Sequence, residues 1–225
     1  MVTYRILTLL LLTSLWLHAA ATTREFDVGM QALLAGDYAE AYCRWKPLAE
    51  RGDADAQYHL GWLYANGNGL RVDTAKAFAW WQRAATQGHA DAQFAVGFAL
   101  TMGDGTERDL KHAVDWYLKA AQQGHEDARD TLVRLAADPE AELLERHPEL
   151  VSAPWFGWHG TVKGDRVNVR AKDGTDGKIV AKLDKGTAVR VIARRGEWLR
   201  ITFTEAGGAG HSGWIYENLI TGQNE

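Results

Sequence analysis

Apolar and small residues recur through the first part of the chain at the spacing that places them on one face of a helix. In the clearest example, Ala56, Leu60 and Leu63 share a helical face between polar positions. Glycine and asparagine alternate at residues 66–69, where they end that helix because both residue types tolerate positive φ. The pattern predicts an α-helix over about residues 53–64.

A second apolar stripe follows and completes a helical hairpin. Trp80, Trp81 and the alanines around them give its packing face, because small residues let helices approach while large rings fill the remaining holes. Asp73 precedes the stripe as an N-cap, whose carboxylate accepts the unpaired N–H groups of the first turn. Gly88 follows it, where a residue in the left-handed conformation ends the helix.

The hairpin repeats with a period of 36 residues. The first hairpin is shorter, because Gly29 lies only 32 residues before Gly61, and the last unit keeps one helix, residues 126–136. A fixed period of this size predicts a solenoid, in which about three repeats are needed for a stable stack. The recurring positions are Gly52, Gly88 and Gly124; Asp55, Asp91 and Asp127; Asp37, Asp73 and Asp109; and Trp45, Trp81 and Tyr117.

These motifs resemble the Sel1-like repeat family, which is related to tetratricopeptide repeats. The resemblance rests on Ala54–Tyr64 and Ala75–Ala85 in one unit, and on Ala90–Phe98 and Ala113–Ala121 in the next. It implies an all-α solenoid over residues 22–137 that binds a protein partner on a curved face and has no chemistry of its own. The alternative is that this short array only supports the module that follows it.

Helical spacing ends after Trp158, and short runs of alternating polar and apolar residues take over. Val167 and Val169 alternate with polar neighbours, as the inward residues of a half-buried strand do. Turns at residues 184–187 and 195–197 separate some of these runs. Short strands with such turns predict a small barrel or sandwich. The expected strands are residues 166–170, 179–183, 188–193, 198–203 and 214–216.

This segment resembles the bacterial SH3-like domains of exported proteins. The resemblance rests on Val167–Arg170, Lys185–Thr187, Gly196–Ile201 and Gly213–Ile215. It implies an all-β SH3-like barrel over residues 160–222 that binds a ligand outside the inner membrane, often peptidoglycan or a peptide. The fold class expected for the whole chain is therefore multidomain, an α solenoid followed by a small β barrel.

The resemblance also guides the choice of candidate ligand-binding residues. Trp198 opens a strand beside a turn, which suits a groove; a core ring under the barrel rim is the alternative. Tyr216 and Leu219 stand where relatives that bind Pro-rich peptides carry Pro and Tyr, so a Pro-rich ligand is not expected. Trp214 is expected in the core. The candidate set is Trp198, Tyr216, Arg170, Trp155 and Trp158.

Residues 138–159 connect the two predicted modules. They begin with an Asp-Pro pair, which predicts a helix over residues 140–146, since Pro is pre-organised for the first helical position. Three aromatic rings follow within residues 155–158. Because rings favour burial, they are expected to cap the last repeat or the barrel, with an exposed ligand platform as the alternative.

The first 21 residues have the pattern of a signal peptide. Arg5 precedes an apolar run, residues 6–17, and Ala19 and Ala21 form an Ala-x-Ala cleavage site. The run is shorter than the ~20 residues of a transmembrane helix, and an uncleaved anchor is the alternative. Since the first cysteine is Cys43, a lipoprotein is not expected. The chain is therefore expected in the periplasm or secreted, with membrane contact only during export.

Charge differs between the predicted modules. Residues 22–159 carry 13 Lys and Arg against 21 Asp and Glu, a net charge of −8. Residues 160–225 carry 11 against 8, a net charge of +3. The formal net charge of the whole chain is −4. This balance lacks the strongly basic surface of a nucleic-acid binder, so no nucleic-acid partner is expected.

Residues suited to catalysis or metal binding are scarce. Ser212 lacks the glycine two positions later that a nucleophile elbow needs. Cys43 is the single cysteine and is expected to be small, buried and inert. His89 and His125 form no His-x-x-x-His pair and are expected to be solvated residues at helix starts. No catalytic residue, metal or cofactor is therefore expected, and the chain is not expected to be an enzyme.

Three functions fit these observations. The first is an exported non-catalytic scaffold or adaptor, whose repeats bind a protein partner while the barrel binds the cell wall or a peptide. The second is a regulatory or targeting subunit of a peptidoglycan-modifying enzyme. The third is a hydrolase with an unrecognised site. The sequence leaves open the identity of the partner and the face of the repeats that binds it.

Overall fold

The computed structural model describes residues 24–138, 140–151, 153, 155–204 and 210–222. The predicted signal peptide, residues 1–21, lies outside the described residues. The chain divides into two compact units, residues 1–108 and 109–225. The boundary falls within the repeats, so the helices after Arg108 pack in the same unit as the barrel.

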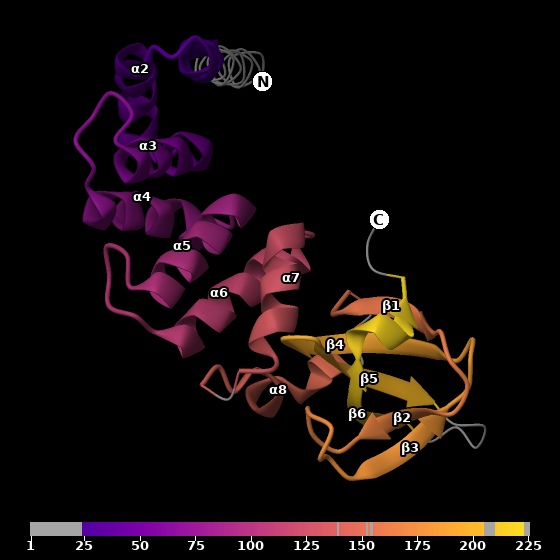
Figure 1. The fold of residues 1–225 in the computed structure, drawn as a ribbon. Coiled ribbons are helices and arrows are strands. Elements are labelled where there is room, and N and C mark those ends of the chain that lie inside the picture. The colour runs from indigo at the N-terminus through magenta and orange to yellow at the C-terminus, as the bar shows by residue number, and fades with distance from the viewer. Residues whose placement is uncertain (1–23, 139, 152, 154, 205–209, 223–225) are drawn as a thin grey trace, which may run out of the picture. The chain divides into compact units, whose positions relative to one another are not determined.

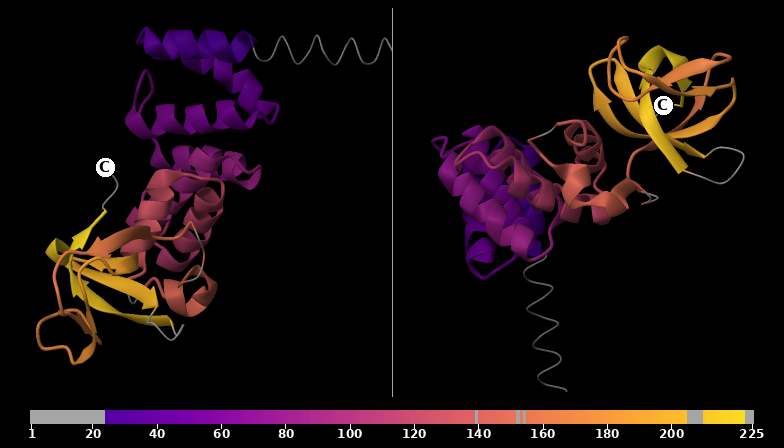
Figure 2. Two further views of the ribbon diagram at one scale, coloured as in Figure 1. Left: turned by 90° about the vertical axis from the view of Figure 1, so that its right-hand side faces the viewer. Right: turned by 90° about the horizontal axis from the view of Figure 1, so that it is seen from below.

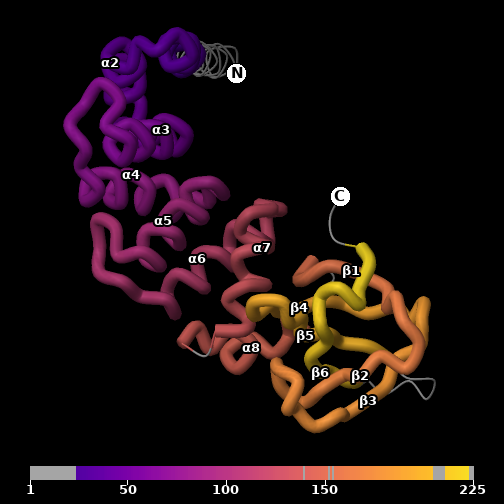
Figure 3. The backbone as a smooth tube through the Cα atoms, in the orientation of Figure 1, coloured from indigo at the N-terminus to yellow at the C-terminus, as the bar shows by residue number. Residues whose placement is uncertain are grey.

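The first unit consists of helices that pack in sequence order (Figure 1). A helix over residues 24–34 packs against α2 (Tyr38–Glu50) and forms the short first hairpin. The second hairpin is α3 (Ala54–Asn66) and α4 (Thr74–Thr86), whose longer loop is visible in Figure 3. A further helix, α5 (Ala90–Met102), follows. This arrangement confirms the predicted solenoid of helical hairpins.

Aspartate and histidine side chains begin these helices. The carboxylates of Asp37, Asp53 and Asp73 each accept the backbone N–H three residues later, as predicted for Asp73. His89 takes this role at α5, where its Nδ1 accepts the corresponding N–H at 3.2 Å. One period later, His125 caps the following helix. The predicted position of both histidines at helix starts is confirmed, but His89 is not the solvated residue that was predicted, because its side chain is only 13% exposed.

Two glycine–tryptophan contacts join neighbouring helices of the first unit. A Cβ atom on Gly61 of α3 would lie 2.4 Å from the indole Nε1 of Trp81 on α4, so only glycine fits under the ring. Gly29 and Trp45 make the same contact in the first hairpin. Each indole N–H donates to a backbone carbonyl of the helix beneath it, at 3.2 Å and 3.3 Å. Helix contact thus depends on both residues of each pair.

The second unit begins with α6 (Leu110–Gln122) and α7 (Glu126–Leu135). The helix predicted over residues 140–146 is shorter than expected: α8 covers only Leu143–Arg146. Glu142 has a φ of 47°, a left-handed conformation that an α-helix does not contain, so α8 starts after it. Upstream, the Asp138 carboxylate accepts the N–H of Glu140 at 2.9 Å in a local turn. A 3-10 helix, Pro148–Val151, follows α8.

Antiparallel strands form the barrel of the second unit (Figure 2). Their order is β3-β2-β6-β5-β4-β1-β7. Five of these seven strands match the predicted ones. The other two, β1 and β7, were missed, because Gly160 interrupts the apolar alternation of β1. A Cβ there would lie 2.6 Å from the side chain of Ile220 on β7. The strands are β1 (Trp158–Val162), β2 (Val167–Arg170), β3 (Ile179–Leu183), β4 (Ala188–Arg195), β5 (Trp198–Thr204), β6 (Gly210–Tyr216) and β7 (Ile220–Thr221).

Aliphatic side chains fill most of the barrel interior. Leu199, Ile201 and Phe203 alternate inward along β5, as the sequence pattern predicted. A bulge in β4 between Val191 and Ala193 shifts the alternation, so Ala193 packs outside this core. The buried core residues are Val162, Val167, Val169, Leu183, Val189, Val191, Leu199, Ile201, Phe203, Ile215 and Ile220.

Candidate functional site

Two of the predicted site residues, Trp198 and Tyr216, face each other on the barrel. They are cross-strand partners on β5 and β6, and their ring centroids lie 5.5 Å apart at 83°. Beside them, Arg194 forms an ion pair with Glu217 at 2.7 Å. Both rings are half-buried, so they form an edge-to-face aromatic pair that a ligand can reach only in part.

Arg170, another predicted site residue, makes a hydrogen bond to the loop that follows β2. Its guanidinium donates to the backbone carbonyl of Gly177 at 2.7 Å and so fixes the polar loop that follows β2. Within that loop, Lys172 and Asp176 form an ion pair at 2.8 Å. Arg170 therefore organises the loop of residues 171–177.

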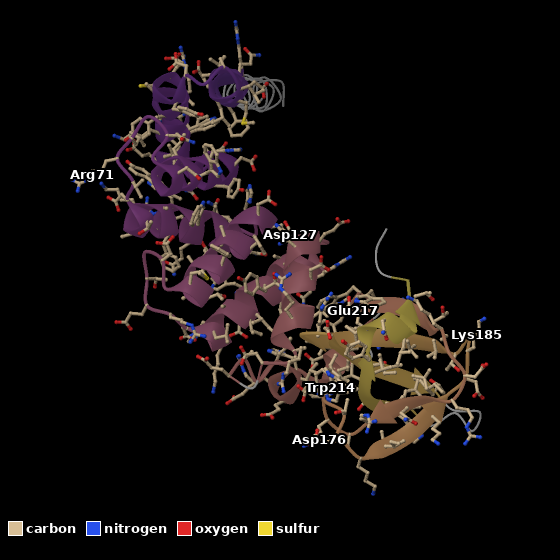
Figure 4. All side chains as sticks on the ribbon, in the orientation of Figure 1. Arg71, Asp127, Asp176, Lys185, Trp214 and Glu217 are labelled. Atoms are coloured by element: carbon tan, nitrogen blue, oxygen red, sulfur yellow. The ribbon has the colours of Figure 1, made fainter. Side chains whose placement is uncertain are left out.

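Trp214 is buried, as predicted, but on the outer face of the barrel rather than in its core. It clusters with Ala193 and with Ala137, which follows α7, and Trp198 packs at the margin of this cluster. The guanidinium of Arg195 lies over the Trp214 ring at 5.7 Å and donates to the carbonyl of Ala137. Figure 4 shows Trp214 on the side of the barrel next to the helical residues of the same unit. The helical segment thus covers part of the aromatic face.

The other two predicted residues, Trp155 and Trp158, lie where the connecting segment enters the barrel. Trp158 begins β1 and packs against the barrel core. Phe156 between them is fully buried, and Trp155 meets it edge-on at 6.1 Å. Arg190 of β4 holds the same segment by donating to backbone carbonyls of residues 151 and 153. These rings cap the barrel, which favours the burial alternative over an exposed platform.

A groove that the sequence reasoning missed lies across four strands of the barrel. It has a volume of about 780 Å³ and is lined by residues of β1, β4, β5 and β6 and by Val151. His159, Arg190, Thr202 and Ser212 contribute to it, one from each strand. No local sequence motif marks this groove, because it depends on the register of four strands.

Apolar side chains also remain exposed on the repeats of the first unit. Phe98 is 51% exposed and Met102 is 62% exposed on α5, and Leu34 is 83% exposed at the end of the first helix. Spacings of four residues put them on one face of each helix, with half-buried neighbours at corresponding positions. We call this set the apolar ladder: Phe26, Met30 and Leu34; Tyr58 and Trp62; and Phe94, Phe98 and Met102.

Two stacked pairs of rings connect residues of adjacent repeats next to the apolar ladder, and one pair includes Tyr58 of the ladder itself. His59 stacks on Trp45 with centroids 4.7 Å apart, and Tyr58 stacks on His89 at 4.8 Å. Burial, and then the nearby His89, lowers the pKa of His59. Burial, and then the charge of Asp91, raises the pKa of Tyr58. These rings hold adjacent repeats in register and fix the helices that carry the ladder.

The cysteine does not lie where it was expected. Cys43 is exposed on α2, so the prediction of a buried thiol was wrong. Its helix buries a different face, which contains Ala41, Trp45 and Leu48. Arg44 next to it is held by ion pairs to Glu25 and Glu40 at 2.9 Å and 2.7 Å.

Metal-ligand clusters and membrane-spanning helices are both absent from the described part of the chain. There, no group of three or more His, Cys, Asp or Glu side chains is arranged to hold a metal ion. None of the helices described combines the length and the apolar composition that crossing a bilayer requires. Ser212 pairs with Thr202 across β5 and β6.

Two family models match the chain. The Sel1 repeat matches residues 54–89 and 90–125, and the bacterial SH3 domain matches residues 165–221. The chain therefore contains two Sel1 repeats and a C-terminal bacterial SH3 domain. Such modules point to roles in protein interaction or cell-wall binding.

The chain is similar to several solved structures. A Sel1 repeat protein from Oxalobacter formigenes is 35% identical, with a TM-score of 0.47, over 54% of this chain and 96% of that one. The protective antigen c5321 of uropathogenic Escherichia coli, which displays an SLR fold, is 32% identical, with a TM-score of 0.53. That match covers 61% of this chain but only 30% of the antigen. Helicobacter pylori cysteine rich protein B is 22% identical, with a TM-score of 0.45, over 53% and 92% of the two chains. A search of curated proteins finds no match.

Proposed function

We propose that these Sel1 repeats and this bacterial SH3 domain make the chain an exported, non-catalytic adaptor. The repeats bind a protein partner, and the barrel binds the cell wall or a peptide. The observation that carries the proposal is the apolar ladder, because Leu34, Phe98 and Met102 expose much of their apolar surface and a partner could cover it. The general roles of both modules support it.

The ladder favours a partner segment with apolar side chains of its own. Phe98 and Met102 offer a ring and a flexible thioether, which together accommodate irregular apolar surfaces. Stacking on His89 holds Tyr58 of the ladder in place, so part of the surface is ordered before the partner arrives. We expect an amphipathic helix or an extended apolar segment to bind here.

Export to the periplasm or beyond belongs to the same proposal. The pattern of residues 1–21 supports it, and the absence of a cysteine at the cleavage site argues against a lipoprotein. N-terminal sequencing of the exported protein is the test. A mature chain that starts after Ala21 is expected, and one that still starts at Met1 contradicts cleavage.

Capture of partners from native periplasm tests the role of the repeats. The purified chain serves as bait beside a variant with Phe98→Ser and Met102→Ser. Val72→Ser is the matched control, because Val72 is 55% exposed in the same unit but lies outside the ladder. The unchanged chain and the control should retain the same protein, and the ladder variant should lose it. Equal retention by all three chains contradicts binding at the ladder.

The identity of the captured protein separates two versions of this function. A partner with no activity on peptidoglycan supports a general adaptor. A peptidoglycan-modifying enzyme would make the chain its targeting or regulatory subunit. Sedimentation of the purified chain with peptidoglycan sacculi at low and high salt tests wall contact, because the net charge of +3 over residues 160–225 favours an anionic polymer. If the chain fails to sediment with sacculi at low salt, contact with the cell wall is contradicted.

A further inference from the structure

The apolar ladder is flanked by carboxylates at one end. Asp55 and Asp91 stand in the first turns of α3 and α5, three residues before Tyr58 and Phe94. That spacing puts each aspartate on the helix face that carries the ladder. The side chain of Asp55 is 66% exposed, and Asp91 is exposed as well. The charge of Asp91 also reaches the ladder itself, because, after burial, it is the second cause that raises the pKa of Tyr58.

Lysine and arginine are absent from these two helices. Over their full described lengths, α3 and α5 contain one aspartate each and no Lys or Arg. The neighbouring helices α2 and α4 do contain such residues, but those are held by other groups. Arg44 forms ion pairs at 2.9 Å and 2.7 Å, and Lys76 forms one with Asp73 at 2.9 Å. The formal charge of α3 and α5 is therefore negative.

The histidine beside Asp55 leaves the charge of this carboxylate in place. The Nδ1 atom of His89 accepts the N–H of Ala92 at 3.2 Å, which assigns the ring proton to Nε2. This Nε2 lies 3.2 Å from the Asp55 carboxylate and donates to it. A neutral imidazole thus fixes the carboxylate without neutralising it. Burial, and then the nearby His89, lowers the pKa of His59, which keeps that ring uncharged near neutral pH as well.

Aromatic rings make this end of the ladder continuous from one repeat to the next. The ring centroid of Phe26, on the first helix, lies 5.5 Å from that of His59 on α3. His59 lies 5.2 Å from Tyr58, and Tyr58 stacks on His89 at the start of α5, at 4.8 Å. All four rings are partly exposed. A partner that crosses the repeats here therefore meets one surface rather than separate side chains.

The two ends of the ladder differ in chemistry. The aspartates lie at the N-terminal ends of α3 and α5, whereas Trp62, Phe98 and Met102 lie in the C-terminal halves of these helices. A segment that crosses both helices meets a negative edge and an apolar edge. The complementary segment carries a row of basic side chains beside a row of apolar ones.

We propose that the partner binds the ladder through a cationic amphipathic helix, with its Lys and Arg side chains beside Asp55 and Asp91 and its apolar side chains on Trp62, Phe98 and Met102. This partner chemistry rests on the adaptor role proposed above. A helix fits because ladder side chains spaced four residues apart form ridges that pack into the grooves of another helix. The aspartates select the sign of the partner's charge, since exposed charges contribute more to specificity than to affinity.

Binding of fluorescent model peptides to the full purified chain, measured by anisotropy, is the test. The first peptide consists of leucine and lysine over about five helical turns, with the leucines on one face. The second has glutamate in place of every lysine. The third is the lysine peptide with a central proline, which breaks the helix and leaves charge and apolar content almost unchanged.

Chain variants locate the binding site. Asp55→Asn combined with Asp91→Asn removes both charges with little change of shape. Asp104→Asn is the matched control, because Asp104 is an exposed aspartate of the same unit outside the ladder. The variant with Phe98→Ser and Met102→Ser removes the apolar end. Unchanged thermal unfolding and circular dichroism confirm that each variant folds.

The lysine peptide should bind the unchanged chain and Asp104→Asn equally well. It should bind the double asparagine variant about three- to tenfold more weakly, as expected for the loss of two exposed charges, and should not bind the serine variant. Added salt should weaken binding to the unchanged chain more than binding to the asparagine variant. The glutamate and proline peptides should both bind the unchanged chain more weakly than the lysine peptide does.

The outcomes separate this partner chemistry from the adaptor role. A lysine peptide that does not bind, that binds no better than the glutamate peptide, or that binds the asparagine variant as well as the unchanged chain overturns the cationic partner. Equal binding of the proline and lysine peptides overturns the helical form. The adaptor role stands in each case if capture from the periplasm still depends on Phe98 and Met102, and it fails if capture is independent of them.

Discussion

The repeats and the barrel use aromatic rings in opposite ways. In the first unit, Trp45 and Trp81 lie on glycines of neighbouring helices, so their rings join the repeats. The barrel fills its core mainly with Val, Leu and Ile and carries Trp198 and Trp214 on its outer face. Trp45 and Trp81 therefore join helices in the first unit, whereas Trp198 and Trp214 pack on the outer face of the barrel.

This difference bears on what each region binds. The repeats also leave a periodic set of apolar side chains partly or largely exposed, and such a set suits a protein segment. The barrel's outer rings are partly covered by helical residues of the same unit. Among the described residues, its groove is lined mainly by Thr, Ser, His and Arg side chains. The surfaces of the two regions therefore differ in their chemistry, one mainly apolar and the other mainly polar.

The largest expected effect comes from removing a framework ring. Trp45→Ala should destabilise the chain by about 3–5 kcal/mol, since Trp45 is fully buried and stacks on His59. Trp198→Ala, on the barrel surface, should cost about 1–2 kcal/mol because its ring is only half-buried. Urea unfolding of both variants measures the difference. Equal losses would contradict the distinction between framework and surface rings.

A smaller effect is expected from the glycine under a ring. Gly61→Ala adds a methyl group 2.4 Å from the Trp81 indole and should cost about 1–3 kcal/mol. In an ordinary helix the same change stabilises by up to about 1 kcal/mol, so the sign is diagnostic. A double variant with Trp81→Leu gives the control, since the methyl group then has space and its cost should fall. A stabilising Gly61→Ala would show that the ring does not constrain the helix.

A weaker, pH-dependent effect is expected at His59. Its pKa is lowered by burial, so the unfolded chain binds a proton at higher pH than the folded chain does. The contribution of His59 to the unfolding free energy should be fully present above about pH 6.5. It should fall as the pH drops from there towards the lowered pKa of the folded chain. His59→Gln should flatten the dependence of the unfolding free energy on pH across that window.

His112 provides a control with the opposite sign. Hydrogen bonding to Asp109 raises the pKa of His112, so its contribution is present below pH 6.5 and is lost as the pH rises through the raised folded pKa. His112→Gln should therefore remove the loss of stability above about pH 6.5 and leave the fall below that pH, which belongs to His59, unchanged. Identical pH profiles for both variants and the unchanged chain would contradict the assignment to His59.

Sequence reasoning succeeded where a residue acts through its immediate neighbours. The period of 36 predicted the helices, and Asp73 was identified as a cap because a cap depends on the next three residues. His89 was misjudged because histidine seldom caps a helix, although it occupies the position of Asp53 one repeat later. A position-by-position alignment of the repeats would have identified His89 as a helix cap.

The features that were missed depend on contacts between distant segments. β1 and β7 are defined by pairing between residues about 60 apart, and Gly160 hides the alternation that would mark a strand. The groove depends on four strands in register, from His159 to Ser212. Of the predicted site residues, the sequence placed Trp198 and Tyr216 correctly on the barrel but gave no sign that Arg170 holds its own loop.

The smallest expected effect on stability is at Cys43, which belongs to neither the framework nor the ladder. Because its side chain is exposed, Cys43→Ser should change the unfolding free energy by less than about 0.5 kcal/mol. The folded chain should nevertheless react with a thiol reagent as fast as the chain unfolded in urea, since no packing shields the sulfur. The serine variant, which carries no thiol, gives the background rate. Protection of the thiol in the folded chain would show that α2 buries the face that carries Cys43. The first hairpin would then pack through a face of α2 other than the one that carries Trp45.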